Sequence, residues 1–117
     1  MALGDLNELA NALRVFARER EWEQFHSPRN LAAALCVEAS EVLEHFQWLT
    51  DEQSRALIDE EKQRVAMELA DVLNYLVRMA DQLNIDLLKA AEQKLAINAQ
   101  KYPVERARGT SKKYSDL

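Results

Sequence analysis

The chain has 117 residues, which fits one domain, and its hydrophobic content of 48% is ordinary for a globular protein. Only two glycines and two prolines argue against a sheet-rich fold with many tight turns, and a net charge of −5 argues against broad nucleic-acid binding. No apolar run approaches the ~20 residues of a membrane span, and no secretory signal is seen at the start. The single Cys36 fits a reducing compartment, so we expect a cytoplasmic protein.

Helical periodicity dominates the first half of the chain. It predicts one helix over about residues 5–20 and a second over about 28–48. In the connector between them, Ser27 is a good helix cap, and Pro28 suits the first helical turn that follows.

The second half of the chain is also predicted to be helical. Residues 51–63 are polar and form either a short helix or a loop, and two long helices are predicted over about 61–83 and 86–101. The last helix stops before Pro103, because the residue before a proline usually leaves helical geometry. The fold class is therefore all-α, a four-helix-bundle-like single domain over residues 1–117 with a basic tail at 103–117.

The third predicted helix is apolar around most of its circumference. Its expected inward-facing residues are Val65, Leu69, Val72, Leu73, Leu76, Met79, Ala80 and Leu83. Further apolar side chains lie elsewhere on the same helix, such as Met67 and Val77. Because four helices can hardly cover such a surface alone, we expect a homo-dimer or homo-tetramer whose core continues across subunits.

The tail differs in charge from the rest of the chain. From Lys101 onward there are five basic and two acidic residues, so this segment carries a net charge of +3. It is either a loose, solvated end or a segment that folds back towards an anionic ligand.

Two short acidic motifs, Glu38-x-x-Glu41 and Glu68-x-x-Asp71, lie on the second and third predicted helices. Residues three apart project from nearly the same face of a helix, so antiparallel packing of these helices brings four carboxylates together. Such a cluster repels itself unless protons or a cation neutralise it, and all-oxygen sites suit Mg²⁺ or Mn²⁺. Both motifs are embedded in apolar stretches, which indicates partial burial and favours a metal site over two solvated acidic faces.

Two other interpretations compete with an enzymatic one. The acidic residues of a non-catalytic helical oligomerisation or interaction module would form a polar seam between subunits. A carboxylate-bridged di-iron bundle needs Glu-x-x-His pairs, and neither Glu38 nor Glu68 has a histidine three residues later.

At these motifs the chain resembles the MazG-like all-α nucleoside triphosphate pyrophosphohydrolases. The connector from Arg20 to Leu31, which reads REWEQFHSPRNL, is similar to that of the dCTP pyrophosphatase branch, as are Phe46-Gln47-Trp48, the segment from Asp71 to Leu76, and parts of the tail. The resemblance covers about residues 16–114. It implies hydrolysis of a nucleoside triphosphate, with dCTP or a related dNTP favoured, to the monophosphate and pyrophosphate, typically as nucleotide-pool house-cleaning by dimers or tetramers.

The resemblance also assigns roles by position. Glu38, Glu41, Glu68 and Asp71 match the family's Mg²⁺ ligands, and Trp22, His26, Trp48 and Tyr75 match residues around the nucleotide. Animal members of the branch have a polar residue where this chain has Leu13, which predicts a looser preference for cytosine.

Two further roles follow from the chemistry of the residues. Glu41 is our choice for the carboxylate that takes a proton from the attacking water. Lys94, Asn98 and Lys101 recur at spacings of four and three on the last helix and either hold the pyrophosphate group or form a solvated polar face.

Overall fold

The computed structural model describes all 117 residues and contains helices but no strands, so the all-α prediction is confirmed. The chain divides into two compact units, Met1–Asn84 and Ile85–Leu117, and each is described by itself. None of the helices combines the length and the apolar character that crossing a membrane requires.

The four long helices predicted from the sequence are all present. The first unit contains α1 (Leu6–Glu19), the 3-10 turn η1 (Glu23–Phe25), α2 (Pro28–Glu44), the short α3 (Asp51–Ser54) and α4 (Asp59–Gln82). The second unit contains α5 (Leu87–Lys101), the short α6 (Val104–Ala107) and the 3-10 turn η2 (Tyr114–Asp116).

Helix starts follow the capping residues. The Ser27 hydroxyl accepts a hydrogen bond from the Asn30 backbone N–H at 3.2 Å, and Pro28 occupies the first turn of α2, as predicted. The end of α2 differs from the prediction, since the helix stops at Glu44 rather than near Trp48. The Phe46 N–H bonds to the carbonyl of Leu43, three residues back, so the last turn tightens and the chain leaves the helix axis.

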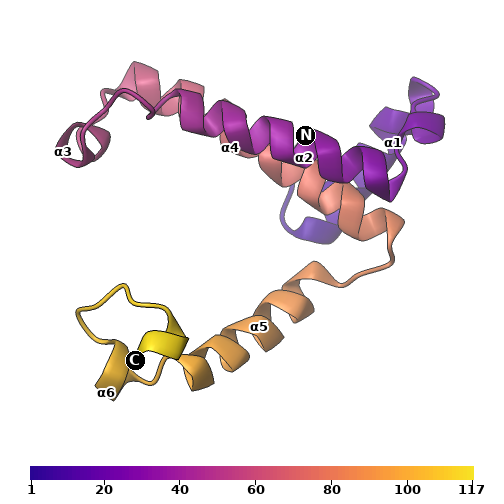
Figure 1. Cartoon of the computed structure of the whole chain (residues 1–117). Coiled ribbons are helices and arrows are strands. Elements are labelled where there is room, and N and C mark those ends of the chain that lie inside the picture. The colour runs from indigo at the N-terminus through magenta and orange to yellow at the C-terminus, as the bar shows by residue number, and fades with distance from the viewer. The chain divides into compact units, whose positions relative to one another are not determined.

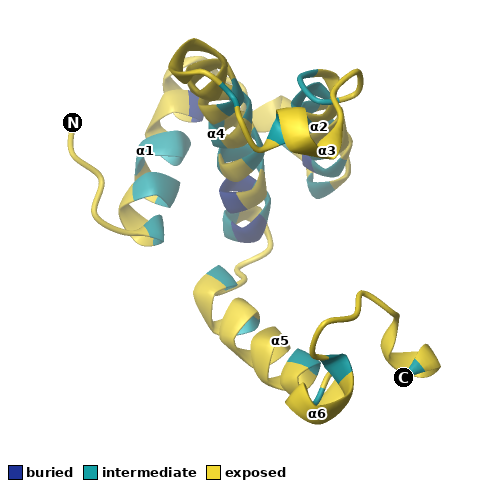
Figure 2. Cartoon of the chain, turned by 90° about the vertical axis from the view of Figure 1, so that its left-hand side faces the viewer, coloured by how far each residue is buried: buried dark blue, intermediate teal, exposed yellow.

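The first unit is built on the pairing of α2 with α4, which run antiparallel, with α1 packed against α4 (Figure 1). Its buried apolar side chains are few: Ala17 of α1, Leu31 of α2, and Val77 and Ala80 of α4. Figure 2 shows most residues of the chain as exposed, with the buried ones confined to these helices. The core of one chain is therefore small for its length.

The predicted inward face of α4 is only partly buried in one chain. Leu69, Leu73, Leu76 and Leu83 are 52%, 40%, 36% and 44% exposed, so for these four the prediction is wrong within a single chain. The reason is geometric: α1 and α2 cover one side of α4, and the apolar surface extends beyond what two helices cover.

The basic tail contacts the end of α5 within the second unit. The Tyr114 backbone N–H donates to the Tyr102 hydroxyl at 3.2 Å, and the two rings meet edge to face with centroids 6.1 Å apart. The Lys101 ammonium lies 4.8 Å from the centre of the Tyr114 ring. The tail thus folds back onto the end of α5.

Candidate metal and nucleotide site

Three of the four predicted carboxylates converge between α2 and α4. Glu38 and Glu41 project from α2 and Glu68 from α4, and one carboxylate oxygen of each lies within 4.8 Å of the others. The spacing of three residues puts both glutamates of α2 on one face, and the pairing of the two helices turns that face towards Glu68.

The cluster contains acceptors that no protein group satisfies. The Oε2 atoms of Glu38 and Glu68 are both buried without a hydrogen-bond partner. The other side of Glu68 is near His45, whose Nε2 lies 3.7 Å from Oε1. Buried carboxylate oxygens normally have partners, and a hard divalent cation takes oxygen ligands of this kind. The donor set therefore fits a divalent metal.

The electrostatics of the cluster agree with that fit. The pKa of Glu38 is raised from 4.5 to about 7, first by loss of solvent and then by the carboxylates of Glu41, Asp71 and Glu68. The pKa of Glu68 is also raised, by desolvation and by Glu41, and the neighbouring His45 opposes part of that effect. Without a cation, the folded protein must hold a proton on the cluster at neutral pH or accept the repulsion.

Asp71 is placed differently from the other three. It is exposed and does not join their close group, so the expected burial is wrong for this residue. Its charge nevertheless raises the pKa of Glu38, and its side chain lines a hollow between α1, the connector and α4. Asp71 therefore links the acidic cluster to that hollow.

The hollow has a volume of about 410 Å³, within the range of small-molecule sites. Its wall includes three of the four residues that were expected around a nucleotide: Trp22, His26 and Tyr75. Trp22 and His26 lie together, with ring centroids 6.2 Å apart. Leu13 and Asn74 also line the hollow.

The fourth expected aromatic residue is not brought to the hollow. Trp48 is 86% exposed on the turn after α2 and does not line it. Because α2 ends at Glu44, the indole is not held on a helix face. Lys94, Asn98 and Lys101 all lie on α5 in the second unit, so their predicted contact with phosphates stays a prediction.

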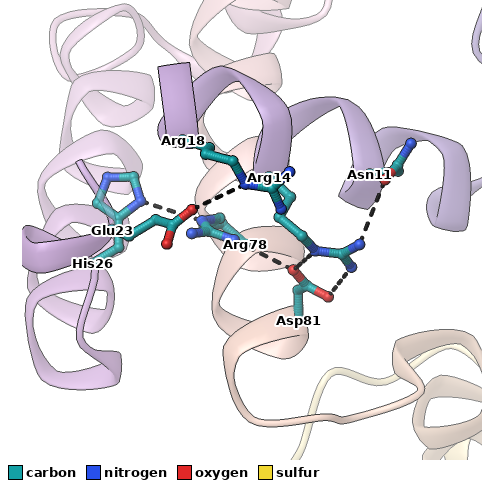
Figure 3. Close-up of polar contacts among 7 residues, drawn as sticks. All are labelled: Asn11, Arg14, Arg18, Glu23, His26, Arg78 and Asp81. Carbon is teal, nitrogen blue, oxygen red and sulfur yellow. Dashed lines mark hydrogen bonds and ion pairs between the residues drawn. The ribbon is translucent and has the colours of Figure 1, made fainter. Parts of the chain in front are cut away.

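An ionic network that the sequence did not predict lies beside the hollow. Arg78 and Asp81 of α4 interact with Arg14 of α1 and with His26 of the connector (Figure 3). One signal was available, because Arg78 continues the helical stripe of Glu68, Asp71 and Tyr75. The pairing of Asp81 with Arg14 of α1 depends on how each helix is rotated about its axis, and the sequence does not specify that rotation.

The raised pKa of Glu38 predicts how stability of the metal-free protein depends on pH. A carboxyl whose folded-state pKa lies above its unfolded value of 4.5 stabilises the fold fully below that value, and the contribution is lost as pH rises through about 7. The melting temperature in EDTA should therefore fall between about pH 5 and about pH 8, and added divalent cation should restore it at the upper end.

Glu38→Gln keeps the shape of the side chain and removes the titration, so it should flatten this pH dependence. Glu61→Gln, at an exposed position on the same helix as Glu68, is the matched control and should leave the dependence as in wild type. If the melting temperature in EDTA fell equally steeply with pH in wild type and in Glu38→Gln, the raised pKa would not belong to Glu38.

Similarity to known proteins agrees with this site. The model of the MazG-like family matches residues 33–117, which include all four carboxylates. The dCTP pyrophosphatase 1 of Rattus norvegicus is 47% identical over 104 residues, and that of Homo sapiens is 46% identical. Each match covers 87% of this chain and 61% of the relative, so the chain spans less than two thirds of these relatives' length.

The fold has a solved counterpart as well. A pyrophosphatase from Archaeoglobus fulgidus superposes with a TM-score of 0.80 at 35% identity, covering 88% of this chain and 96% of that one. MazG-like pyrophosphatases generally depend on a divalent metal, which is what the unsatisfied carboxylates fit. With the family match running over most of its length, the chain belongs to the MazG-like family.

Proposed function

We propose that this chain is a Mg²⁺-dependent nucleoside triphosphate pyrophosphohydrolase, with Mn²⁺ as a possible substitute. It cleaves a dNTP, dCTP or a related or modified dNTP being favoured, to the dNMP and pyrophosphate. The observation that carries the proposal is the adjacency of the acidic cluster and the aromatic hollow: Asp71 lines the hollow and its charge raises the pKa of Glu38 in the cluster. The names of the rat and human relatives support the choice of substrate.

The carboxylates have two proposed roles, metal binding and proton transfer. Glu38, Glu41, Glu68 and Asp71 would hold the metal, since they supply only hard oxygen donors. When bound, the cation offsets the charge that develops on the phosphates during hydrolysis. Glu41 is the proposed general base that accepts a proton from the attacking water. The products are a dNMP and pyrophosphate because the reaction breaks the bridge between the α- and β-phosphates, with the water's oxygen ending on one of the two phosphorus atoms.

The hollow is the proposed base site. Trp22 and Tyr75 supply flat faces, and stacking on aromatic side chains is worth about 1–3 kcal/mol per base in single-strand binders. His26 supplies a hydrogen-bonding edge, which selects among bases more sharply than stacking does. Leu13 offers no polar contact, so a second dNTP should be used appreciably. Trp48 is retained in the proposal as a stacking residue.

Other parts of the proposal concern the assembly. The exposed leucines of α4 favour a homo-dimer or homo-tetramer as the working form, and the family match across residues 33–117 favours one functional domain. Lys94, Asn98 and Lys101 are the proposed contacts to the pyrophosphate group. We place the protein in the cytoplasm, where hydrolysis of unwanted dNTPs would cleanse the nucleotide pool.

The first prediction concerns the products. With Mg²⁺ the protein should convert dCTP to dCMP and pyrophosphate, and EDTA should abolish the reaction because it removes the cation that offsets the charge developing on the phosphates. The products formed from each dNTP and NTP would be separated and identified by ion-exchange chromatography. Release of orthophosphate and a nucleoside diphosphate would contradict it, and inactivity towards every nucleotide would favour the non-catalytic interaction module.

The second prediction concerns the carboxylates. Changing Glu38, Glu41 or Glu68 to Gln, or Asp71 to Asn, should lower kcat/KM by roughly a hundredfold or more, because metal-site residues outside the direct ligands already cost 10–100-fold. Circular dichroism should show intact helices. The Glu61→Gln control should keep wild-type turnover. If all four variants stayed near wild type, the metal site would lie elsewhere.

The third prediction concerns the oligomer. Light scattering at micromolar concentration should give the mass of a dimer or a tetramer, since Leu69, Leu73 and Leu76 leave a helix face apolar and exposed in one chain. Leu73→Glu should dissociate the assembly if this face forms the interface. A wild-type chain that runs as an active monomer would contradict the prediction.

A further inference from the structure

Arg78 is a charged residue inside the small core. Its side chain is 5% exposed, and it is the one buried polar or charged residue of the chain. A guanidinium removed from water needs partners for its N–H groups and for its charge. Arg78 also lines the aromatic hollow, so whatever holds it in place also shapes the proposed base site.

One set of partners fixes the position of Arg78. Its Nη1 donates to Oδ2 of Asp81 at 3.3 Å, and the same carboxylate accepts two hydrogen bonds from Arg14, at 3.0 Å from Nε and 2.6 Å from Nη2. The bidentate geometry fastens α1 to α4. The pKa of Asp81 is lowered, first by the Arg14 hydrogen bond, so the carboxylate is charged when it receives Arg78.

The other partner of Arg78 is a histidine. Nε of Arg78 lies 3.2 Å from Nδ1 of His26, and it can only donate, because a guanidinium has no acceptor (Figure 3). Nδ1 must therefore carry a lone pair, and the ring must be neutral with its hydrogen on Nε2. The pKa of His26 is lowered, mainly by burial and further by the charge of Arg78, which agrees with a neutral ring.

This hydrogen bond decides what His26 offers to a ligand. The imidazole lines the hollow beside Trp22, and its Nδ1 is already engaged. The remaining polar group is the Nε2–H, which donates and cannot accept. A base that turns a carbonyl oxygen or an unprotonated ring nitrogen towards it gains a hydrogen bond, whereas one that turns an amino group towards it leaves two donors unpaired.

We propose that Arg78 is a positioning residue for base selection: through Nδ1 it orients His26 and keeps the Nε2–H as a donor to an acceptor edge of the base. Asp81 and Arg14 hold Arg78 for this role. The proposal rests on the function proposed above, in which the hollow is the base site. In this proposal Arg78 acts on base selection through its hydrogen bond to His26.

The experiment measures three properties of wild type, Arg78→Met, Arg78→Lys, His26→Ala and the Arg78→Met/His26→Ala double variant. Long-range ¹H–¹⁵N correlation spectra show which ring nitrogen of His26 carries the hydrogen. The ratio of kcat/KM between dCTP and the other dNTPs reports selection in turnover. Calorimetric binding of the four dNMPs gives the same ratio without turnover. Arg64→Met, at an exposed arginine of the same helix, is the matched control.

The wild-type spectrum should show hydrogen on Nε2 only. Arg78→Met should mix the tautomers and change the base ratio by roughly threefold to tenfold, which lies in the lower part of the range for residues in contact. It should cause no further change in the His26→Ala background, since Arg78 acts through His26. Arg78→Lys can still donate to Nδ1 and should retain part of the selection. Arg64→Met should leave the spectrum and the ratio unchanged.

Three results would overturn the proposal: hydrogen on Nδ1 in wild type, an Arg78→Met effect that simply adds to that of His26→Ala, or no difference among the dNMPs in binding. The wild-type spectrum decides the tautomer even if Arg78→Met does not fold, and Arg78→Lys then supplies the ratio. A protein that binds dNMPs selectively but hydrolyses no triphosphate would refute the proposed function and leave this inference standing.

Discussion

The pairing of α2 with α4 brings carboxylates together in spite of their mutual repulsion. Helix packing holds Glu38, Glu41 and Glu68 together although their charges oppose it, and burial denies two of their oxygens a partner. Such an arrangement costs stability in the metal-free chain and is relieved by a proton or by a divalent cation. In the proposed function, the same feature that weakens the metal-free fold forms the site for a metal and, through it, for an anionic nucleotide.

The fold places the acidic cluster and the aromatic hollow at different positions along α4. The carboxylates face the middle of the α2–α4 pair, whereas the aromatic hollow lies where α1 and the connector meet α4. Asp71 stands between them, lining the hollow and acting on the pKa of Glu38. A nucleoside triphosphate is long enough for its base and its phosphates to bind in separate environments. In the proposed function, one helix, α4, sets the distance between the two.

Local sequence determined the elements well. The spacing of three placed Glu38 and Glu41 on one face of α2, and Ser27 and Pro28 marked the start of that helix. The sequence did not predict features that depend on how two or more helices pack together. The exposure of Leu73 and the ion pair of Arg14 with Asp81 are set by how far each helix is rotated, and periodicity does not specify that angle.

Trp48 shows a different limit. Its place on a helix was predicted from continuing periodicity, but α2 ends at Glu44 and leaves the indole on an exposed turn. A sequence gives helix boundaries with an uncertainty of a few residues, and that is enough to move a side chain off a helix face.

The central claim, that the cluster holds a divalent metal that serves a nucleotide in the adjacent hollow, is tested most directly by a crystal structure. The protein would be crystallised with Mn²⁺ and a non-hydrolysable dCTP analogue, and the metal located by anomalous scattering. We expect metal bonded to oxygens of Glu38, Glu41, Glu68 and Asp71, with the base between Trp22 and Tyr75. Metal bound elsewhere, or a nucleotide bound with no metal at these carboxylates, would contradict it.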